Sequence, residues 1–287
     1  MKKYKICKIL LVILAIFLCV AFYELLGICV AYKKQPEVSN TTKKETKNGS
    51  WNECSENTER AVIIEKNPEA LLQRVRLIKN AKKEIILSTF AFQSDESGKL
   101  ILGALHDAAD RGVHIRLLVD GMESWIDMEG NPYFYGLSSH ENVEIKLYNK
   151  ANPLKPWKMM GRMHDKYLIA DGKRYILGGR NTYNYFLGDF PGHKNYDRDV
   201  LVVCDEPEKE NSVNQLLEYF ETIWEQEDSG YFHDNKKLAN RKSVKNAVLE
   251  LQNSYQKYFE ENKERICDTD YTDETFETEK IALVSNP

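Results

Sequence analysis

A histidine and a lysine separated by one residue, His164 and Lys166, lie in the segment MHDKYLIADGKRYILGGRNTYNYF, residues 163–186. On a β-strand this spacing places both side chains on the same face. A neutral imidazole can attack phosphorus in a phosphodiester and form a phosphohistidine, which divides one displacement into two easier steps. A fixed ammonium beside it stabilises the charge that spreads over the nonbridging oxygens. The pair therefore predicts phosphodiester chemistry with His164 as nucleophile.

The residues that follow this pair suit the same substrate. Gly178 and Gly179 let a phosphate come close to the backbone. Asn181 offers an amide donor, and Arg180 is a candidate for a further phosphate contact. The six cysteines include no CxxC pair and no metal-ligand spacing is seen, so we expect neither a metal nor another cofactor.

The complete spacing is H-x-K-x4-D-x6-G-G-x-N, with Asp171 as its acidic member. It resembles the signature of the phospholipase D superfamily, HxKxxxxD followed by a Gly-Gly or Gly-Ser pair and an asparagine. The resemblance implies attack by His164, a second histidine as acid for the leaving alcohol, and release to water or another alcohol. It also implies that Asp171 orients the structure rather than carrying a proton.

The flanking sequence narrows the resemblance to one branch. Residues 84–121 and 178–203 are similar to bacterial cardiolipin synthases, and the likeness extends over roughly residues 61–230. This implies a membrane-bound enzyme that moves phosphatidyl groups between alcohols, with a phosphatidylglycerol-like lipid as substrate. In this superfamily an acidic residue near the last strand holds a catalytic imidazole. Asp197 matches it best, and Asp199 is the alternative.

A basic and aromatic loop precedes His164 and contains Trp157, Lys155 and Lys158. Because Trp and Lys suit membrane interfaces, we interpret Trp157 as part of a lip that meets lipid headgroups and acyl chains. Ordinary loop packing is the alternative interpretation.

The chain carries one copy of the motif, whereas the superfamily site normally combines two. Three interpretations follow. The chain forms a homodimer, as single-motif nucleases of the superfamily do; it is the N-terminal half of a longer enzyme; or it is an inactive half that binds phosphate. The apolar residues 281–284 read as a strand that begins a second lobe, which favours the second interpretation.

The elements that must position the motif alternate along the chain. The strands and helices that the pattern predicts lie at 61–64, from 67, at 84–92, 100–111, 113–119, 143–148, 163–170, 174–177, 199–204 and 213–227. Asp171-Gly172 predicts a hairpin turn between two of these strands. The alternation predicts an α/β fold with a mixed, largely parallel sheet flanked by helices.

Four segments divide the chain. Residues 1–34 form a basic tail and an apolar run of about 24 residues, which at 1.5 Å per residue can span a hydrocarbon core of about 30 Å. We interpret it as an uncleaved membrane anchor rather than a signal peptide, because no small-x-small exit follows. Residues 35–60 are a polar linker, 61–230 the catalytic lobe, and 231–287 a charged connector helix, an acidic loop and the start of a possible second lobe.

Lysines on both sides of the apolar run nearly balance, and the short basic tail favours a catalytic lobe outside the cytoplasm. The 40 Lys and Arg against 44 Asp and Glu argue against a protein that coats nucleic acid, and we expect no nucleic-acid partner. The expected activity is a membrane-anchored phosphatidyltransferase or phospholipase D, with a dimeric nuclease as the alternative.

Overall fold

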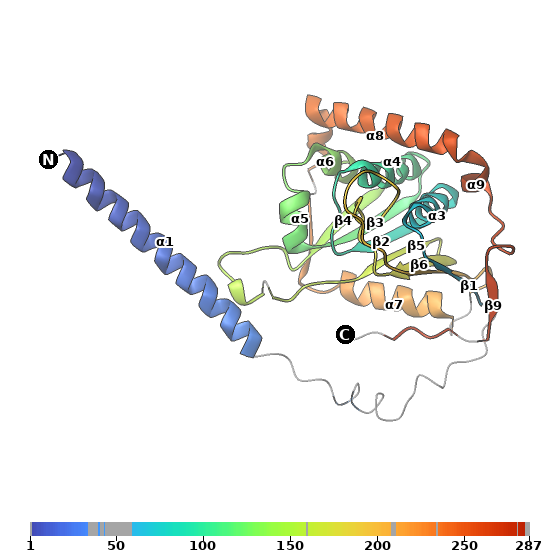
Figure 1. Cartoon of the computed structure of the whole chain (residues 1–287), viewed down its shortest axis with the longest axis horizontal. Helices are drawn as coiled ribbons and strands as arrows, with labels where there is room; N and C mark the ends of the chain where they lie inside the picture. The colour runs from blue at the N-terminus through green and yellow to red at the C-terminus, as the bar shows by residue number, and fades with distance from the viewer. Residues whose placement is uncertain are drawn as a thin grey trace.

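The computed structural model describes residues 2–33, 59–158, 160–207, 211–233, 235–279 and 281–284, together with Asn40 and Lys43. Nearly all of the polar segment expected at 35–60 lies outside these residues. The described part contains a long N-terminal helix, α1 (Lys2–Lys33), and an α/β lobe (Figure 1).

The lobe is built on one sheet, whose nine described strands run in the order β8-β4-β3-β2-β5-β6-β7-β1-β9. Their bounds are β1 (Glu59–Ile64), β2 (Glu84–Thr89), β3 (His114–Asp120), β4 (Val143–Tyr148), β5 (Lys166–Ala170), β6 (Arg174–Gly178), β7 (Asp199–Val203), β8 (Ser229–Tyr231) and β9 (Phe276–Thr278). The sheet is mixed, as expected. The expectation of a largely parallel sheet is wrong, because among the described strands only β2–β3 and β3–β4 pair in parallel.

The motif strands β5 and β6 form a hairpin at the centre of this sheet. Asp171 and Gly172 both have positive φ angles, 55° and 63°, as the central residues of a type I′ turn require. With Lys173 as a third loop residue, the strands pair Ala170 with Arg174 and Tyr167 with Leu177. The hairpin predicted from Asp171-Gly172 is confirmed.

Helices cover both faces of the sheet (Figure 1). On one face lie α3 (Asn67–Asn80) and α4 (Glu96–Asp110), and on the other lies α7 (Ser212–Trp224). Two short helices that the sequence pattern did not predict, α5 (Gly121–Asp127) and α6 (Pro132–Ser138), join β3 to β4.

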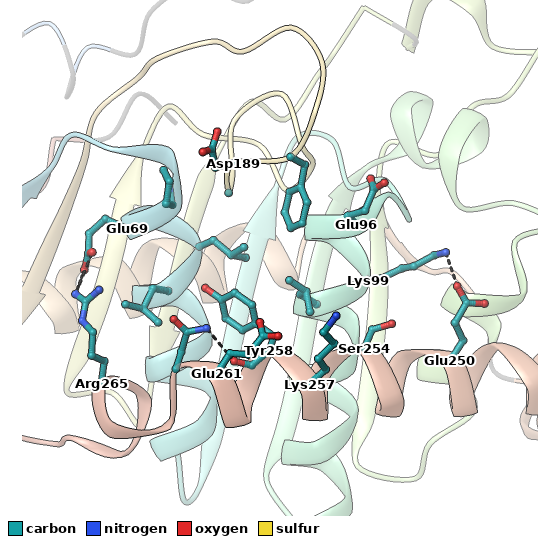
Figure 2. A pocket seen from close by; sticks show the side chains of 17 residues that line it. Glu69, Glu96, Lys99, Asp189, Glu250, Ser254, Lys257, Tyr258, Glu261 and Arg265 are labelled. Carbon is teal, nitrogen blue, oxygen red and sulfur yellow. Dashed lines mark hydrogen bonds and ion pairs between the residues drawn. The ribbon is translucent and has the colours of Figure 1, made fainter.

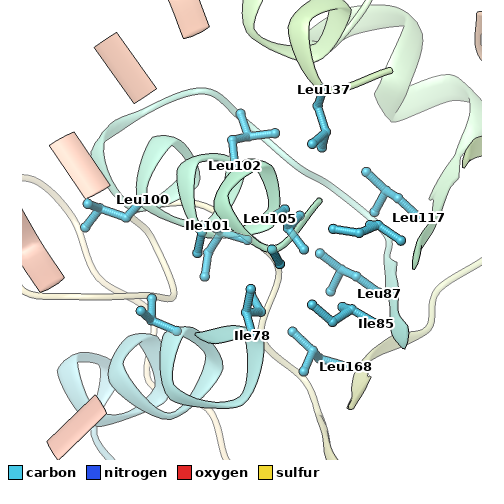
Figure 3. Packing of buried hydrophobic residues seen from close by; sticks show 14 of the residues in the cluster. Ile78, Ile85, Leu87, Leu100, Ile101, Leu102, Leu105, Leu117, Leu137 and Leu168 are labelled. Atoms are coloured by element: carbon cyan, nitrogen blue, oxygen red, sulfur yellow. The ribbon is translucent and has the colours of Figure 1, made fainter. Parts of the chain in front are cut away.

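Alternate side chains of the central strands pack into two separate cores, one on each face of the sheet. In β2, Ile85 and Leu87 belong to the core under α3 and α4, where Ile78, Ile101 and Leu105 meet them (Figure 3). Ile86 belongs to the opposite core, which includes Phe220 of α7. A strand buried on both faces in this way is expected to read as a continuous apolar run, which explains the EIIL segment of β2.

The helix expected as a connector packs on this same lobe. It consists of α8 (Lys242–Glu261) and the short α9 (Lys263–Cys267), and α8 contacts α4 and α6. Its apolar stripe is buried there, through Val244, Ala247, Leu251, Tyr255 and Phe259. The thin stripe is therefore the inner face of a covering helix.

The C-terminal segment also belongs to this lobe, so the prediction of a strand at 281–284 is wrong. The last described strand is β9, which adds to β1 inside the stretch expected to be an acidic loop. Ile281 and Leu283 lie without strand pairing beside the core under α7, and Leu283 donates its N–H to Gln215.

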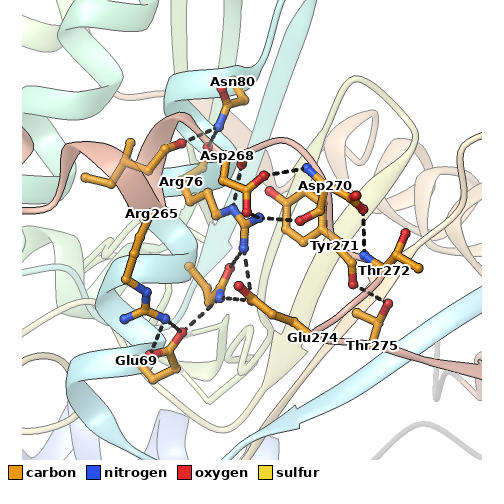
Figure 4. Close-up of polar contacts among 12 residues, drawn as sticks. Glu69, Arg76, Asn80, Arg265, Asp268, Asp270, Tyr271, Thr272, Glu274 and Thr275 are labelled. Atoms are coloured by element: carbon orange, nitrogen blue, oxygen red, sulfur yellow. Dashed lines mark hydrogen bonds and ion pairs between the residues drawn. The ribbon is translucent and has the colours of Figure 1, made fainter.

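A buried arginine ties the segment after α9 to α3 (Figure 4). Arg76, only 1% exposed, donates to the carbonyl oxygens of Asp268 and Asp270, pairs with Glu274 at 2.9 Å and lies over the ring of Tyr271. This network holds the chain in the path that leads to β9.

Candidate active site

His164, Lys166, Gly178, Gly179, Asn181 and Asp197 gather at one end of the sheet, whereas Asp171, Trp157 and Arg180 do not join them. This end is formed by the carboxyl ends of β2, β3 and β6 and by the amino ends of β5 and β7. His164 lies two residues before β5, and Lys166 is its first residue, paired with Thr89 at the end of β2. The strand order therefore brings together the ends of strands that lie as far apart in the sequence as residues 89 and 199.

His164 is exposed, whereas Lys166 is 6% exposed and donates from Nζ to the carbonyl oxygen of His164 at 2.7 Å. Burial lowers the pKa of Lys166 to about 8, although Asp165 and Asp197 act in the opposite direction. Burial first, and then the Lys166 charge, also lower the pKa of His164 from its usual value of 6.5. A neutral imidazole thus lies beside an ammonium near pH 7.

Phe90, which the sequence reasoning did not single out, lies under both groups. Its ring meets the imidazole of His164 edge-on at 4.7 Å between centroids. Lys166 Nζ lies 5.2 Å and the Arg162 guanidinium 4.9 Å from the centre of the same ring. The available signal was an aromatic residue directly after the β-forming run at residues 84–89.

Asp120, the last residue of β3, fixes the chain that enters the motif. Its carboxylate, 1% exposed, accepts from the backbone N–H of Met163 at 3.1 Å and from Arg162 Nε at 2.9 Å. Because both donors directly precede His164, Asp120 fixes the backbone position from which the imidazole extends. The sequence showed a strand ending in Asp here without indicating this role.

Asn181 lies beside the end of β2 and is 7% exposed. Its Oδ1 accepts from the backbone N–H of Ala91 at 3.2 Å, which leaves the Nδ2 amide as the donor of the side chain. The backbone of Thr182 pairs with the segment after β2 and holds this position.

Asp197 lies against Gly179, where a side chain would find no room. A Cβ on Gly179 would come within 2.5 Å of the Asp197 Cγ. Asp197 is half-buried and accepts from the N–H of Arg198. The glycine pair therefore admits a carboxylate close to the backbone, near Lys166.

The alternative residue, Asp199, is fully buried and already paired. Its Oδ2 accepts from Arg74 at 2.9 Å and from Arg180 at 3.3 Å. Two guanidinium groups thus hold this carboxylate inside the lobe, beneath the glycine pair.

Arg180 is not a phosphate contact, which corrects the expectation for it. The side chain is fully buried and donates to Asn67, to the carbonyl oxygens of Ile64 and Glu65, and to Asp199. With its donors directed to the start of α3 and to β7, it positions β1 and β7 instead.

Asp171 lies at the opposite end of β5 from His164. Its carboxylate accepts from the backbone N–H groups of Lys82, Lys83 and Glu84, at 2.7–3.1 Å. It therefore ties the hairpin turn to the start of β2 and does not approach the imidazole.

Trp157 lies in the short helix η2 (Pro156–Lys158) of the loop before His164, and it is 45% exposed. That loop contacts α1 rather than the imidazole. Among the described residues, no group of three or more His, Cys, Asp or Glu side chains that could hold a metal ion is found.

A separate groove of about 660 Å³ runs between α8, the starts of α3 and α4, and residues 188–190 (Figure 2). Two ion pairs lie among its charged side chains, Glu69 with Arg265 at 2.8 Å and Lys99 with Glu250 at 2.6 Å. None of the predicted site residues lines it.

The geometry agrees with the comparison to protein families. The family model described as "Cardiolipin synthase, PLD-like domain" matches residues 74–224, more than half of the chain. The chain belongs to this phospholipase D-like family. The match spans β2 to α7 and so includes every strand around His164.

Relatives of this phospholipase D-like chain include longer proteins. An uncharacterized protein of Helicobacter pylori J99 is 30% identical over 212 residues, covering 69% of this chain and 39% of that protein. Cardiolipin synthase C of Escherichia coli K12 is 29% identical over 171 residues, covering 55% and 34%. The chain thus spans about a third to two-fifths of their length.

A solved structure shares the fold of the phospholipase D-like lobe. Phosphatidylserine synthase of Haemophilus influenzae superposes with a TM-score of 0.50 at 17% identity, covering 77% of this chain and 48% of that protein.

Phe90 provides a test of how the phospholipase D-like site is positioned. Replacing it with leucine removes the edge contact to His164 and the ring beneath Lys166, so we expect kcat/KM to fall about tenfold. Phe90→Tyr keeps the ring and should retain activity. A leucine variant with unchanged kcat/KM, measured on the phosphodiester substrate, would show that the ring serves packing only.

Proposed function

We propose that this chain is a membrane-anchored phosphatidyltransferase or phospholipase D of the cardiolipin synthase type. The observation that carries the proposal is an exposed His164 with a buried Lys166 fixed beside it, at the end of the sheet formed by the carboxyl ends of β2, β3 and β6. Membership of the phospholipase D-like family and the apolar helix α1 support it. Lys5–Lys33, 29 residues, is the one described helix that is long and apolar enough to cross a membrane.

In the proposed reaction, the neutral imidazole of His164 attacks the phosphorus of a phosphatidylglycerol-like donor. A P–N bond forms as the bond from phosphorus to the leaving alcohol breaks, and that alcohol takes a proton from an acid. Lys166 and the Asn181 amide stabilise the nonbridging oxygens. A second alcohol or water then attacks phosphorus and gives its proton to the same acid group, which is deprotonated after the first step, and the P–N bond breaks to release neutral His164.

The acid for the leaving alcohol is the histidine of a second motif, since none of the other five histidines of the sequence has a lysine two residues later. We propose that a second copy of the motif supplies it, either from another chain or from a further segment of a longer protein. Asp197, near Lys166 and beside Gly179, is the carboxylate that would orient a catalytic imidazole.

The direct test is incubation of the purified full chain with phosphatidylglycerol vesicles. Cardiolipin with glycerol, or phosphatidic acid, is the expected product. Absence of both products from the wild type, both alone and mixed with a polypeptide that carries a second motif, contradicts the proposal, as does DNA cleavage by a preparation that leaves the lipid intact.

The pH dependence follows from the two shifted groups. The mechanism needs His164 neutral and Lys166 protonated. Activity should therefore rise as pH passes the His164 pKa, below 6.5, and fall as pH passes about 8, where Lys166 loses its proton. The profile of kcat/KM against pH reports these groups in the free enzyme.

Lys166→Arg is the matched variant for this profile, because a guanidinium does not titrate in this range. We expect the alkaline limb to disappear or to move upward. An alkaline limb that stays in place in the arginine variant would assign it to another group.

A further inference from the structure

The loop between β4 and β5 is a compact unit that projects from the sheet. At its base, Asn149 adopts a positive φ of 53° and donates from Nδ2 to the carbonyl oxygens of Gly161, at 2.7 Å, and Lys158. Within the loop, the N–H groups of Lys155, Lys158 and Gly161 each bond three residues back. Residues 149–158, 160 and 161 are therefore held by hydrogen bonds within the loop, outside the core.

This loop docks on α1 (Figure 1). Gly27 is the one described residue of α1 that is buried, and a Cβ there would collide with the ring of Pro156. One turn earlier, the Tyr23 hydroxyl donates to the carbonyl oxygen of Leu154 at 2.9 Å. Ala21, Glu24 and Ala31 are half-buried and, together with Gly27, are spaced three or four residues apart on the same face.

The position of this contact along α1 sets its depth in a bilayer. The apolar run begins at Ile9 after the basic tail, and about 20 residues at 1.5 Å each cross the hydrocarbon core. The far boundary then falls close to Gly27. Leu154 bonds Tyr23, about 6 Å to the membrane side of Gly27 at that rise.

The outer surface of the loop has the composition of an interfacial segment. Leu154, Trp157 and Met160 are 78%, 45% and 50% exposed. Lys150 and Lys155 are exposed beside them and suit anionic headgroups. A hollow of about 660 Å³ between the end of α1 and the loop is lined by Val30, Tyr32, Trp157 and Met160, among others.

We infer that Leu154, Trp157 and Met160 insert into the membrane interface, clamped to the anchor helix at Gly27, and that this clamp fixes how the lobe faces the lipid. The occupant of the exposed face is the bilayer surface, with Leu154, Trp157 and Met160 among acyl chains and the lysines among phosphates.

The clamp bears on the reaction because only two residues, both held by hydrogen bonds, separate the loop from His164. The loop ends at Gly161, and the next two residues, Arg162 and Met163, are held by Asp120 directly before His164. Docking at Gly27 therefore sets the height of the imidazole above the bilayer, an inference that rests on the proposed membrane anchor and lipid substrate.

The first test measures tryptophan quenching by lipids brominated near the headgroup, with the full chain in phosphatidylcholine–phosphatidylglycerol vesicles. We expect Trp157→Phe to lose most of the quenching that the wild type shows. Trp125→Phe, a change at a 62% exposed tryptophan of α5, should keep it. Unchanged quenching in Trp157→Phe overturns the inference.

Carbonate extraction of the same vesicles separates the two claims. A chain that carbonate releases contradicts the anchor and hence the proposed function. A chain that stays in the bilayer but shows no quenching from Trp157 contradicts the inserted loop alone.

The second test removes the clamp. Gly27→Phe fills the contact with Pro156, whereas Leu26→Phe adds an aromatic ring on the 48% exposed neighbouring face and is the matched control. Gly27→Phe should lower Trp157 quenching and reduce turnover of vesicle lipid about tenfold, with hydrolysis of a soluble short-chain phosphodiester unchanged. Equal quenching in both variants overturns the clamp.

Discussion

Replacing His164 with asparagine is expected to lower kcat/KM for phosphatidylglycerol by at least about 10³-fold, because the variant cannot form the P–N bond on which both steps depend. The amide keeps a similar volume, and His164 is exposed, so the fold should survive. Product formation from radiolabelled phosphatidylglycerol vesicles gives the rate, and mass spectrometry of trapped wild-type enzyme should find phosphate on His164.

His114→Asn is the matched control. His114 begins β3 at the other end of the sheet, where it lies between Glu84 and Glu144. Its loss should change the rate less than twofold, since a surface pair of this kind contributes about 0–1 kcal/mol to stability. Equal activity of wild type and His164→Asn would remove His164 from the mechanism.

Replacing Asp199 with asparagine is expected to destabilise the lobe more than any other single change considered. Asp199 neutralises two buried guanidinium groups, Arg74 at 4% and Arg180 at 0% side-chain exposure. Removing one partner of a buried ion pair costs about 3–5 kcal/mol, because the remaining charge stays buried without compensation. Circular dichroism of the full chain in detergent should show Tm lowered on the order of 10 °C.

Asp197→Asn supplies the contrast, two residues earlier on the same segment. Asp197 is half-buried and carries no such pair of arginines, so its Tm should stay close to wild type while lipid turnover falls. Two variants with the same Tm would contradict the division of labour between these aspartates.

The chemistry-bearing residues were predictable because the motif fixes both type and spacing. The motif spacing set Lys166 beside the backbone of His164, which directly precedes β5, and the Asp171-Gly172 turn brought Gly178 and Asn181 to the same end of the sheet. The role of Arg180 was not predictable, since an arginine beside two glycines reads equally as a phosphate ligand or as a buried pair. Only the order β6-β7-β1 brings Asp199 and the start of α3 to its guanidinium.

The direction of the strands was also beyond the sequence pattern. Alternating strands and helices favour parallel pairing, which holds for β2, β3 and β4. The later strands are joined by short turns or long loops. The direction of such a strand relative to its neighbours follows only when the strand with which it pairs is known. The 281–284 segment illustrates a different limit, because a short apolar run packs against α7 as readily as it would pair in a sheet.

The placement of β1 has a consequence for how the chain folds as it is made. β1 ends at Ile64, whereas its inner neighbour β7 begins at Asp199 and its outer neighbour β9 at Phe276. At synthesis rates of about 5–20 residues per second, β1 waits on the order of ten seconds for its first partner. During that interval the nascent chain, held by its first helix, exposes an unpaired apolar strand beside a half-built sheet. Folding factors that shield such edges should therefore act between the emergence of β1 and that of β7.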